Sequence, residues 1–474
     1  MIYYYRNIYV LEVIYGSGGF YMKEKKHKLS LIFLCLVLVF SFVFIQHIPT
    51  KAADEITVKN LQTVINDSSN RNIKLTLKKN TYEIENTLLM PSNVEIDFNG
   101  STIKRKKGSG VYDLIRNSDT INGNKNIKIC NLVLDGNKDI DSLTATDKAD
   151  RFGGLVLKKV KNSELKNIIV TATVNAEDTA GIYFEDCSDI YGYRINGYNN
   201  DRTAILATRS KVKINESVTY NNLGSGIGSK ASDECEYNNI KTYNNGYSNL
   251  SINGKRCKIN NVLSYGSAYS GVNVGHISNP SDDTILLNVH SYDNGYEGLT
   301  IAGSSGVQVI GLEVYGNVRN NIQIKDNASS TKLLNVVSKN SGGTSAKGII
   351  YKSGKNHYLD SAEIFGNAGS GVYVDAGVSV NMGSSLKCYN NGKKSSSNSA
   401  GIVLNSSVNC TIMKAECYDD QSSKTQETGI WIAGGSGHSI LLNNCHDNKT
   451  YQIRETNSSH SVRYLNNIQR PFTK

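Results

Sequence analysis

The chain has 474 residues, enough for two or three average domains or for one long repeat domain, and its formal net charge is +10. It contains 42 glycines but only 4 prolines, and after residue 80 it is rich in Val, Ile, Tyr, Thr, Ser and Asn. This composition predicts short strands joined by tight turns of Gly, Asn and Asp. A chain of this length can bury its own core, which excludes a small domain held together by disulfides.

Residues 22–53 are arranged like a secretory signal, with a basic start (22–28), an apolar run (29–45) and small residues that suit cleavage after Ala52 or Ala53. The alternative is a membrane anchor, because the apolar run of about 17 residues is at the short limit for a membrane span. Residues 1–21 fit neither a signal nor a fold, so we interpret them as an upstream leader or a misassigned start, with Met22 as the true first residue. These features predict a secreted or cell-surface bacterial protein without stable membrane association after cleavage.

Removal of residues 1–53 leaves 46 basic and 40 acidic residues, a net charge of +6. This mild positive charge suits an acidic polymer such as a uronic-acid polysaccharide, although a soluble surface with a slight lysine excess would look the same. No concentrated basic patch is present, so nucleic acid is not predicted as a partner. Nothing in the sequence indicates the oligomeric state.

Eight of the nine cysteines follow the predicted cleavage site, and most alternate with Ile, Val or Leu, as in CKI (257–259) and CTI (410–412). This pattern is typical of small buried hydrophobic residues. Cys388, Cys417 and Cys445 share one position in successive repeats, and Cys235 and Cys257 share another. Either set could oxidise, but we interpret both as stacked free thiols.

One sequence unit recurs from about residue 190 to the end: an aromatic residue, Asn or Asp, Asn, a few loop residues, Gly and an alternating strand. Clear copies are TYNNGYSNLSI (242–252), SYDNGYEGLTI (291–301) and VYGNVRNNIQI (314–324). The aromatic position is occupied by Tyr198, Tyr220, Tyr243, Tyr265, Tyr292, Tyr315, Lys339, Phe365, Tyr389, Tyr418 and His446, at steps of 22 to 29 residues. A constant unit at such a step predicts one structural repeat per turn of a solenoid.

Each unit contains three short alternating segments and no helix, as in 298–301, 307–309 and 312–314. The predicted fold is therefore all-β, a single-stranded right-handed parallel β-helix with three strands per coil and about 15 coils, on the order of 70 Å long. The inward row on the strand after the glycine is predicted to be Ile182, Ile205, Ile227, Leu250, Val272, Leu299, Ile322, Ile349, Val372, Ile402 and Ile430. A second row, two residues after each aromatic, is predicted to form a ladder of stacked polar side chains. Its members are Asn200, Asn222, Asn245, Ser267, Asn294, Asn317, Ser341, Asn367, Asn391, Asp420 and Asn448.

The two ends of such a solenoid are strand edges that need covers. Apolar residues at helical spacing in 58–68 predict a short capping helix, and 461–472 carries apolar residues that could close the far end. We expect an N-terminal cap with the first coils at 54–110, the β-helix repeats at 111–466 and a C-terminal tail at 467–474. No linker or second domain is evident.

The helix with its LQ pair, TYEI, SNVEIDFNGSTI, NLVLDGNKD and the Asn-Gly-rich repeats together resemble the pectate-lyase-like superfamily over about residues 56–466. The repeats are especially similar to those of bacterial mannuronan C5-epimerase modules. The resemblance implies a polysaccharide-active β-helix that binds glycan along the sheet that follows the glycine. The epimerases' Tyr-Gly-Phe-Asp-Pro-His-Glu stretch is not matched, because its nearest counterpart, GIYFEDCSD (181–189), lacks the Pro-His pair. These repeats encode the scaffold and by themselves assign no activity.

Outward positions on that sheet and nearby turns hold the candidate site, and polar groups concentrate between residues 183 and 276. The predicted catalytic residues are Tyr183, Glu185, Asp201, Arg202, Lys230 and His276. The predicted substrate-binding residues are Lys158, Arg209, Asn253 and Asn273. Within the repeating unit, Glu297 is interpreted as a solvated loop residue.

Lyase or C5-epimerase chemistry on a uronan needs a cation at the carboxylate, a base for the C5 proton and an acid. Lys230, Arg202 or Arg209 could supply the cation, and Tyr183 or His276 could act as base or acid. Hydrolysis instead needs two carboxylates about 5–9.5 Å apart, for which Glu185 and Asp201 are the best pair. No metal-binding motif is evident, so no cofactor is predicted, with Ca²⁺ as the one ion such a protein could require.

The leading hypothesis is a protein that acts on an anionic uronic-acid polysaccharide by lyase or C5-epimerase chemistry. The alternative is a non-catalytic β-helix that binds glycan or forms part of a cell surface or fibre. A glycoside hydrolase is the third interpretation.

Overall fold

The computed structural model describes residues 11–16, 19–24, 51–52, 56–110, 112–138, 152–174, 180–395, 399–457 and 462–470. The chain divides into two units, Met1–Pro49 and Thr50–Lys474. In the first, β1 (Leu11–Gly16) and β2 (Gly19–Glu24) form an antiparallel hairpin. The apolar segment 29–45 lies outside the described residues. In the part of the chain that is described, no helix is long and apolar enough to span a membrane.

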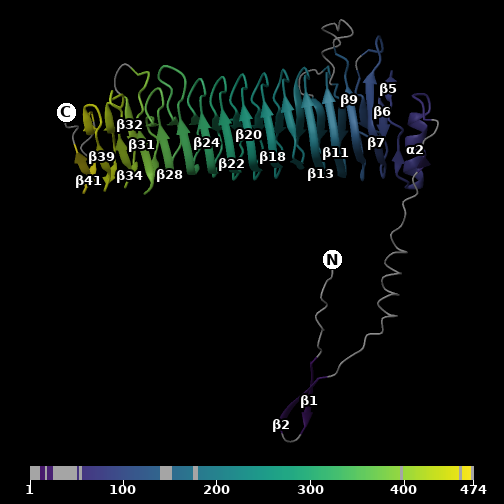
Figure 1. Cartoon of the computed structure of the whole chain (residues 1–474), viewed down its shortest axis with the longest axis horizontal. Helices are drawn as coiled ribbons and strands as arrows, with labels where there is room; N and C mark the ends of the chain where they lie inside the picture. Colours follow the sequence, from purple (N-terminus) through teal and green to yellow (C-terminus); the bar gives the residue numbers. More distant parts are fainter. Residues whose placement is uncertain are drawn as a thin grey trace. The chain divides into compact units, whose positions relative to one another are not determined.

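The second unit begins with a capping helix, α2 (Leu61–Arg71), at one end of a stack of strands (Figure 1). Leu61 and Ile65 are fully buried and face the first coils. The Gln62 side chain donates to the carbonyl of Leu89 (2.8 Å) and accepts from its N–H (2.7 Å), so it satisfies backbone groups of the first strand of the sheet. The predicted capping helix is confirmed, although it begins three residues later than the pattern suggested.

One parallel sheet of 15 strands runs along the whole unit, with one strand from each coil. Its strands in order are β6 (Leu88–Met90), β8 (Ile115–Asn117), β10 (Leu155–Lys158), β12 (Ala180–Glu185), β14 (Thr203–Thr208), β17 (Ile227–Lys230), β19 (Leu250–Ile252), β21 (Val272–Val274), β23 (Leu299–Ala302), β25 (Ile322–Lys325), β27 (Ile349–Tyr351), β29 (Val372–Val374), β32 (Ala400–Leu404), β36 (Thr428–Ile432) and β40 (Tyr451–Glu455). We call it the fifteen-stranded sheet. The predicted right-handed parallel β-helix of about 15 coils is confirmed.

The remaining faces of each coil come from long strands that bend in the middle. They are β7 (Glu95–Arg105), β9 (Lys128–Asp135), β11 (Lys161–Thr171), β13 (Ser188–Tyr198), β18 (Glu236–Tyr243), β20 (Lys258–Tyr265), β22 (Ile285–Tyr292), β24 (Gln308–Tyr315), β26 (Lys332–Lys339) and β28 (His357–Phe365). The bend falls at a residue with left-handed backbone, such as Asn261 (φ 54°) or Gly311 (φ 72°). Asn and Gly tolerate this conformation, so the second and third predicted segments form one continuous bent strand.

Shorter strands divide these faces where a coil is irregular. The pairs within a coil are β4 (Leu75–Thr76) with β5 (Thr81–Ile84), β15 (Val212–Asn215) with β16 (Val218–Tyr220), β30 (Val380–Met382) with β31 (Leu386–Tyr389), β34 (Thr411–Met413) with β35 (Glu416–Tyr418), β38 (Ser439–Leu441) with β39 (Asn444–His446), and β41 (Arg463–Leu465) with β42 (Ile468–Arg470). Three two-residue strands complete the unit: β3 (Lys51–Ala52) pairs with β4, and β33 (Ser407–Val408) with β37 (Gly435–Ser436).

The predicted inward row forms the core. Ile182, Ile205 and their counterparts are in register from strand to strand, and Leu299 and Ile322 are 0% exposed. Alternate residues of each strand point into the solenoid, where each coil packs on its two neighbours. The predicted aromatic row also stacks, with ring centroids about 5 Å apart, as at Tyr220 and Tyr243 (5.0 Å). Lys339 interrupts this row and places its ammonium over Tyr315 (5.1 Å).

The predicted polar ladder is present, with one correction. Asn200 donates to Asn222 (2.8 Å) and Asn222 to Asn245 (2.9 Å), and these amides are buried. Asn245 and Asn317 donate instead to Asn249 and Asn321 in their own turns. In the coil of β36, however, Gln426 accepts from Asn391 (3.0 Å) and donates to the next rung. Asp420, predicted for that position, is exposed and accepts from Asn390 (2.7 Å). A rung must accept from one neighbour and donate to the next, and an ionised carboxylate can only accept, so the Gln426 amide fills the row instead.

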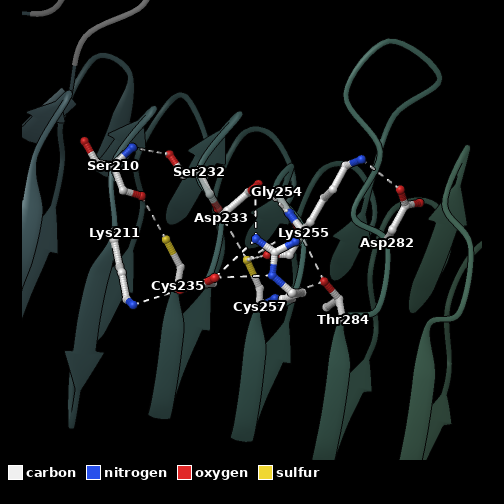
Figure 2. A network of polar contacts seen from close by, with 12 residues as sticks. Ser210, Lys211, Ser232, Asp233, Cys235, Gly254, Lys255, Cys257, Asp282 and Thr284 are labelled. Atoms are coloured by element: carbon white, nitrogen blue, oxygen red, sulfur yellow. Dashed lines mark hydrogen bonds and ion pairs between the residues drawn. The ribbon is translucent and has the colours of Figure 1, made fainter.

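Polar groups also stack in the turns that leave the fifteen-stranded sheet (Figure 2). The Ser210 N–H donates to Ser232 (3.0 Å), and the Cys235 thiol donates to the Ser210 carbonyl (3.3 Å). On the surface beside them, Lys211 pairs with Glu234 (2.8 Å). All cysteines in the described part of the chain are free, and Cys388, Cys417 and Cys445 are in register, as predicted.

The C-terminal end differs from the prediction. β41 and β42 pair with β38 and β39 and extend the solenoid to Arg470, past the expected boundary at 466. Tyr464, Leu465 and Ile468 are 43%, 43% and 50% exposed. The apolar residues of 461–472 that the structure describes therefore continue the last coil, and the expected closure of this end is wrong for them.

Candidate functional site

The outward face of the fifteen-stranded sheet changes from coil to coil, unlike its inward face. Successive outward residues in register are Leu206, Gly228, Ser251, Asn273, Thr300, Gln323, Ile350, Tyr373, Val403 and Trp431. The middle of this row is polar and its two ends are apolar. Two hollows open along the polar stretch.

The first hollow has a volume of about 400 Å³ and lies over β14, β17, β19 and β21. Its functional side chains are Arg202, Lys230, Tyr247, Asn253, Asn273 and His276. Five of these six are among the ten residues predicted from the sequence. They come from four successive coils: Arg202 and Tyr247 precede their strands, whereas Lys230, Asn253 and His276 end or follow theirs, so the hollow extends along the strands.

The electrostatic character of the first hollow is positive. Its described lining contains two cationic side chains, Arg202 and Lys230, and no carboxylate. Both cations are exposed, at the start of β14 and the end of β17 respectively. Two cations in a concave site attract an anionic ligand.

The amides in the first hollow are held by the backbone. Asn253 donates from Nδ2 to the carbonyl of Ser229 (3.2 Å), and Asn273 donates to the carbonyl of Gly275 (3.1 Å). The Oδ1 atom of Asn253 is buried and has no hydrogen-bond partner in the described protein. A buried acceptor without a partner is costly, so Asn253 is the less satisfied of the two amides in this hollow.

The hydrogen bonds of His276 define its tautomer. The backbone N–H of Ser278 donates to Nδ1 (3.2 Å), and the Ser278 hydroxyl lies 2.8 Å from the same atom. An N–H can only donate, so Nδ1 of the neutral ring accepts and the proton resides on Nε2. His276 therefore presents a donor to its surroundings, which suits an acid better than a base.

Tyr247 is a residue of the first hollow that the sequence analysis missed. It is 55% exposed, and its ring stacks on Tyr269 (4.5 Å), which in turn stacks on Tyr296 (4.8 Å). We call Tyr247, Tyr269 and Tyr296 the exposed tyrosine stack. The signal was available, because each follows its ladder residue by two positions in three consecutive coils.

Lys158, Glu185 and Arg209 form a separate surface network. Glu185 pairs with Lys158 (3.2 Å) and with Arg209 (2.9 Å), and Arg209 also pairs with Asp186 (2.7 Å). The Arg209 guanidinium lowers the pKa of Asp186 through a hydrogen bond. The predicted substrate-binding cations Lys158 and Arg209 are thus already paired with acids and do not line the first hollow.

The predicted carboxylate pair for hydrolysis is wrong. Glu185 is in register with Thr208, at the last residues of β12 and β14, whereas Asp201 precedes the start of β14. The two acids therefore lie at opposite ends of neighbouring strands, more than about 15 Å apart along the strand direction. Asp201 pairs with Lys138 instead (3.1 Å). Glu185 and Asp201 are close in the sequence, but the sequence alone does not show that they lie at opposite edges of the sheet.

Tyr183 does not reach the first hollow either. Its outward position is correct, but the side chain is 2% exposed and packs with Val156 and Ala180 in a small apolar cluster outside the main core. Leu206 packs against the same cluster. The phenol in the first hollow is that of Tyr247, not that of Tyr183.

The second hollow, of about 480 Å³, lies further along the same sheet, over β23, β25 and β27. Glu297 lines it and is only 4% exposed, so the interpretation of Glu297 as a solvated loop residue is wrong. The equivalent positions in three preceding coils are Ser225, Ser248 and Ser270, which are also buried, so this position is enclosed in every one of these coils. Burial raises the pKa of Glu297.

Within the described residues, no group of three or more His, Cys, Asp and Glu side chains could hold a metal ion. Neither hollow therefore offers a ligand set for Ca²⁺ in that part of the chain. Calcium prefers six to eight oxygen ligands, several of them carboxylates.

No protein-family model matches the sequence, and no curated protein is significantly similar to it. The structure is similar to the N-terminal fragment of bacteriophage phi29 gene product 12 (TM-score 0.53, 14% identity, 92% of this chain and 96% of that chain). It is also similar to a mutant of the periplasmic alginate epimerase AlgG (TM-score 0.50, 13% identity, 70% and 77% covered). A mannuronan C-5 epimerase A-module of Azotobacter vinelandii gives a TM-score of 0.45 at 13% identity, with 85% and 94% covered. At these identities the first two similarities show the fold, a right-handed parallel β-helix.

Proposed function

We propose that the protein binds an anionic, uronic-acid-containing polysaccharide in the first hollow and acts on it by lyase or C5-epimerase chemistry, outside the cytoplasm. The observation that carries this proposal is the composition of the hollow: two cations, an imidazole, a phenol and two amides, without a described carboxylate. The structural similarity that supports this proposal is the one to AlgG, which is named as a periplasmic alginate epimerase.

Arg202 and Lys230 supply the electrostatic part of the chemistry. Removal of the C5 proton of a uronate places negative charge on the sugar's carboxylate, and a cation at hydrogen-bond distance stabilises that charge. The two side chains line one hollow from opposite strand ends of neighbouring coils, so in this proposal they hold carboxylates of different sugar units of the polymer.

Tyr247 and His276 supply the proton transfers in this proposal. Tyr247 acts as the base that takes the C5 proton, and the electron pair moves toward the sugar's carboxylate, for which Arg202 is the cation at the same strand ends as Tyr247. In a lyase the C4–O bond then breaks and His276 protonates the leaving oxygen. In an epimerase His276 instead returns a proton to C5 from the opposite face. The Nε2–H tautomer of His276 fits the donor role.

Hydrolysis is disfavoured by the same observations. It requires an acid and a second carboxylate flanking the scissile bond. The described lining of the first hollow has none, and Glu185 is held by Lys158 and Arg209.

Non-catalytic glycan binding is the second candidate function, and the exposed tyrosine stack favours it. Tyr247 is 55% exposed and stacks on Tyr269 with one face of its ring, so its other face suits the apolar face of a sugar ring. Under this candidate His276 and Lys230 would only orient the polymer.

The test is incubation of the full chain with alginate, polygalacturonate or hyaluronan, followed by ultraviolet absorbance of unsaturated uronates and by NMR of the products. Unsaturated ends indicate a lyase and inverted C5 centres an epimerase. We expect Lys230→Ala and His276→Ala to abolish either product, while Lys258→Ala on β20 leaves it unchanged. Binding without any product would replace the enzyme proposal by the second candidate, and absence of binding would overturn both.

A further inference from the structure

The second hollow gathers more positive charge than the first. Arg319, Lys325, Lys347 and Lys352 line it around the single acid Glu297. Lys325 pairs with Asp326 (3.3 Å), but no described carboxylate lies within ion-pair distance of the other three cations. Many lysines elsewhere on the surface have such a partner, as Lys211 does. Three uncompensated cations in one concave site indicate an anionic ligand.

We propose that the second hollow is a separate binding site for a carboxylate-bearing sugar unit of the same polymer, held by Arg319, Lys347 and Lys352. This inference rests on the proposed polysaccharide ligand but on a different set of residues. The sugar carboxylate supplies the missing counter-charge, and Arg319 offers a planar fork that matches it.

Lys347 is the least solvated of these cations. Its side chain is half-buried beside Tyr373, with the ammonium 5.4 Å from the ring centre. Burial and the nearby Lys352 both lower the pKa of Lys347. A bound carboxylate would relieve this cost, because an opposite charge at close range favours the ammonium form.

The exposed tyrosine stack connects the two hollows. Tyr247 lines the first hollow, and at the other end of the stack the Arg319 guanidinium lies 3.6 Å from the ring centre of Tyr296. Beside it, the outward residues Asn273, Thr300 and Gln323 continue in register from one hollow to the other. Coils are about 4.8 Å apart, so β17 and β25 are separated by about 19 Å. Only an oligomer can occupy both hollows, and a linked ligand binds more tightly than its separate units.

Glu297 makes the second hollow sensitive to pH. The groups that face it are Arg319, Lys325 and Lys352, which lower its pKa less than burial raises it, and the Ser270 hydroxyl at 3.5 Å. Below its raised pKa, Glu297 is neutral and can donate a hydrogen bond to the sugar carboxylate. As pH rises through that value, Glu297 ionises and competes for the cations. Binding should therefore weaken with rising pH in the native chain but not in Glu297→Gln.

Lysine acylation read by mass spectrometry tests the two hollows separately, because each contains its own lysines. The full chain is treated with an acetylating succinimidyl ester, with and without alginate oligomers. At about ten times the Kd, acylation of Lys347 and Lys352 should slow about tenfold, since only the free fraction reacts. Lys258 and Lys332, which lie on β20 and β26 outside the fifteen-stranded sheet, should react at the same rate throughout.

Variants separate this inference from the proposed function. Protection of Lys347 and Lys352 should persist in Lys230→Ala and disappear in Arg319→Ala. Arg194→Ala is the matched control, because Arg194 also stacks on a tyrosine (4.8 Å from the Tyr193 ring centre) but on β13. Circular dichroism checks that each variant is folded.

The pattern of lysine protection distinguishes the proposal for the first hollow from the proposal for the second. Protection of Lys230 alone would overturn the second site and leave the first intact. Protection of Lys347 and Lys352 alone would do the reverse. Equal protection by inorganic sulfate and by oligomers would show a simple anion site and overturn the assignment to sugar units. A lack of protection at all three lysines, with every uronan tried, would overturn both proposals.

Discussion

The inward and outward faces of the fifteen-stranded sheet follow different rules, although they alternate along the same strands. Leu299 points inward and is in register with Val272 and Ile322, so the same kind of side chain recurs coil after coil. Thr300, its neighbour, points outward in a row that runs from Leu206 to Trp431 without a repeating residue type. Positions whose side-chain type repeats from coil to coil hold the coils together. Positions whose side-chain type changes from coil to coil line the hollows.

This contrast predicts that changes to the two faces separate function from stability. Outward substitutions in the hollows should remove binding or turnover and leave folding intact. Inward substitutions should lower the free energy of unfolding. A single variant that moves both quantities together would break the contrast.

His276→Ala should give the largest effect. Loss of a positioned acid lowers turnover about 10²- to 10⁴-fold. His276 is exposed, so the urea midpoint of unfolding should not change. Steady-state kinetics on the active uronan measure the first quantity, and Lys258→Ala is the control. A variant that loses turnover only by unfolding would break the separation of the two faces.

Leu299→Ala should lower the free energy of unfolding by about 2–5 kcal/mol, because a fully buried leucine leaves a cavity. Leu223→Ala is the matched control, since Leu223 is 66% exposed and Leu299 is 0% exposed. Urea denaturation followed by circular dichroism measures both. Similar losses in the two variants would contradict the assignment of the inward row as the core.

Asp113→Asn should stabilise the protein at neutral pH. Asp113 is buried beside β8, accepts from the Gly153 N–H (2.9 Å), and burial raises its pKa from 3.8 to about 6. The folded state therefore binds the proton more tightly, and stability falls as pH rises from about 4 to about 6, by roughly 3 kcal/mol in all. The amide cannot ionise, so its advantage should be present at neutral pH and vanish in acid. Denaturation at both pH values tests this, and a gain that persists in acid would show that ionisation of the buried carboxyl is not the cause.

Asn317→Ala should lower the free energy of unfolding by about 1–3 kcal/mol, because it leaves buried groups of the polar ladder without partners. Asn317 accepts from Asn294 (2.9 Å) and donates to Asn321 (2.9 Å). The control is Asn66→Ala on the exposed side of α2, which should leave the free energy of unfolding unchanged. If the two variants unfold at the same urea concentration, the ladder does not contribute as a buried network.

Much of the fold could be predicted because its units repeat. The inward row at Ile205 and Leu299 follows from period-two alternation, and the ladder at Asn222 follows from the fixed distance to the aromatic residue. The prediction for Asp420 was wrong because a carboxylate cannot donate to the next rung, so the Gln426 amide occupies the ladder. The predicted closure of the C-terminal end was wrong because apolar residues occur both in a cap and in a further strand, and Tyr464 belongs to a further strand.

The candidate site was predictable where it rests on the same alternation. Lys230, Asn253 and Asn273 are outward residues at or just beyond strands in register, and all three line the first hollow. The prediction placed Glu185 beside Asp201 because they lie on neighbouring coils. Two side chains on neighbouring coils meet only if they also lie at the same end of their strands, and these two do not. Tyr247 was predictable from its fixed distance to the ladder in three consecutive coils, a signal that was missed. Glu297 lies in a turn whose backbone path encloses it, and no periodic pattern predicts that burial.

The central claim is that an anionic polysaccharide binds to the outward face of the fifteen-stranded sheet at the first hollow. Calorimetric titration of alginate oligomers into the native chain, Lys230→Ala and Lys258→Ala tests it most directly, because both variants lose one exposed lysine. Loss of a charged hydrogen bond should raise Kd about 10- to 100-fold for Lys230→Ala only. Equal affinities for Lys230→Ala and Lys258→Ala would contradict the claim.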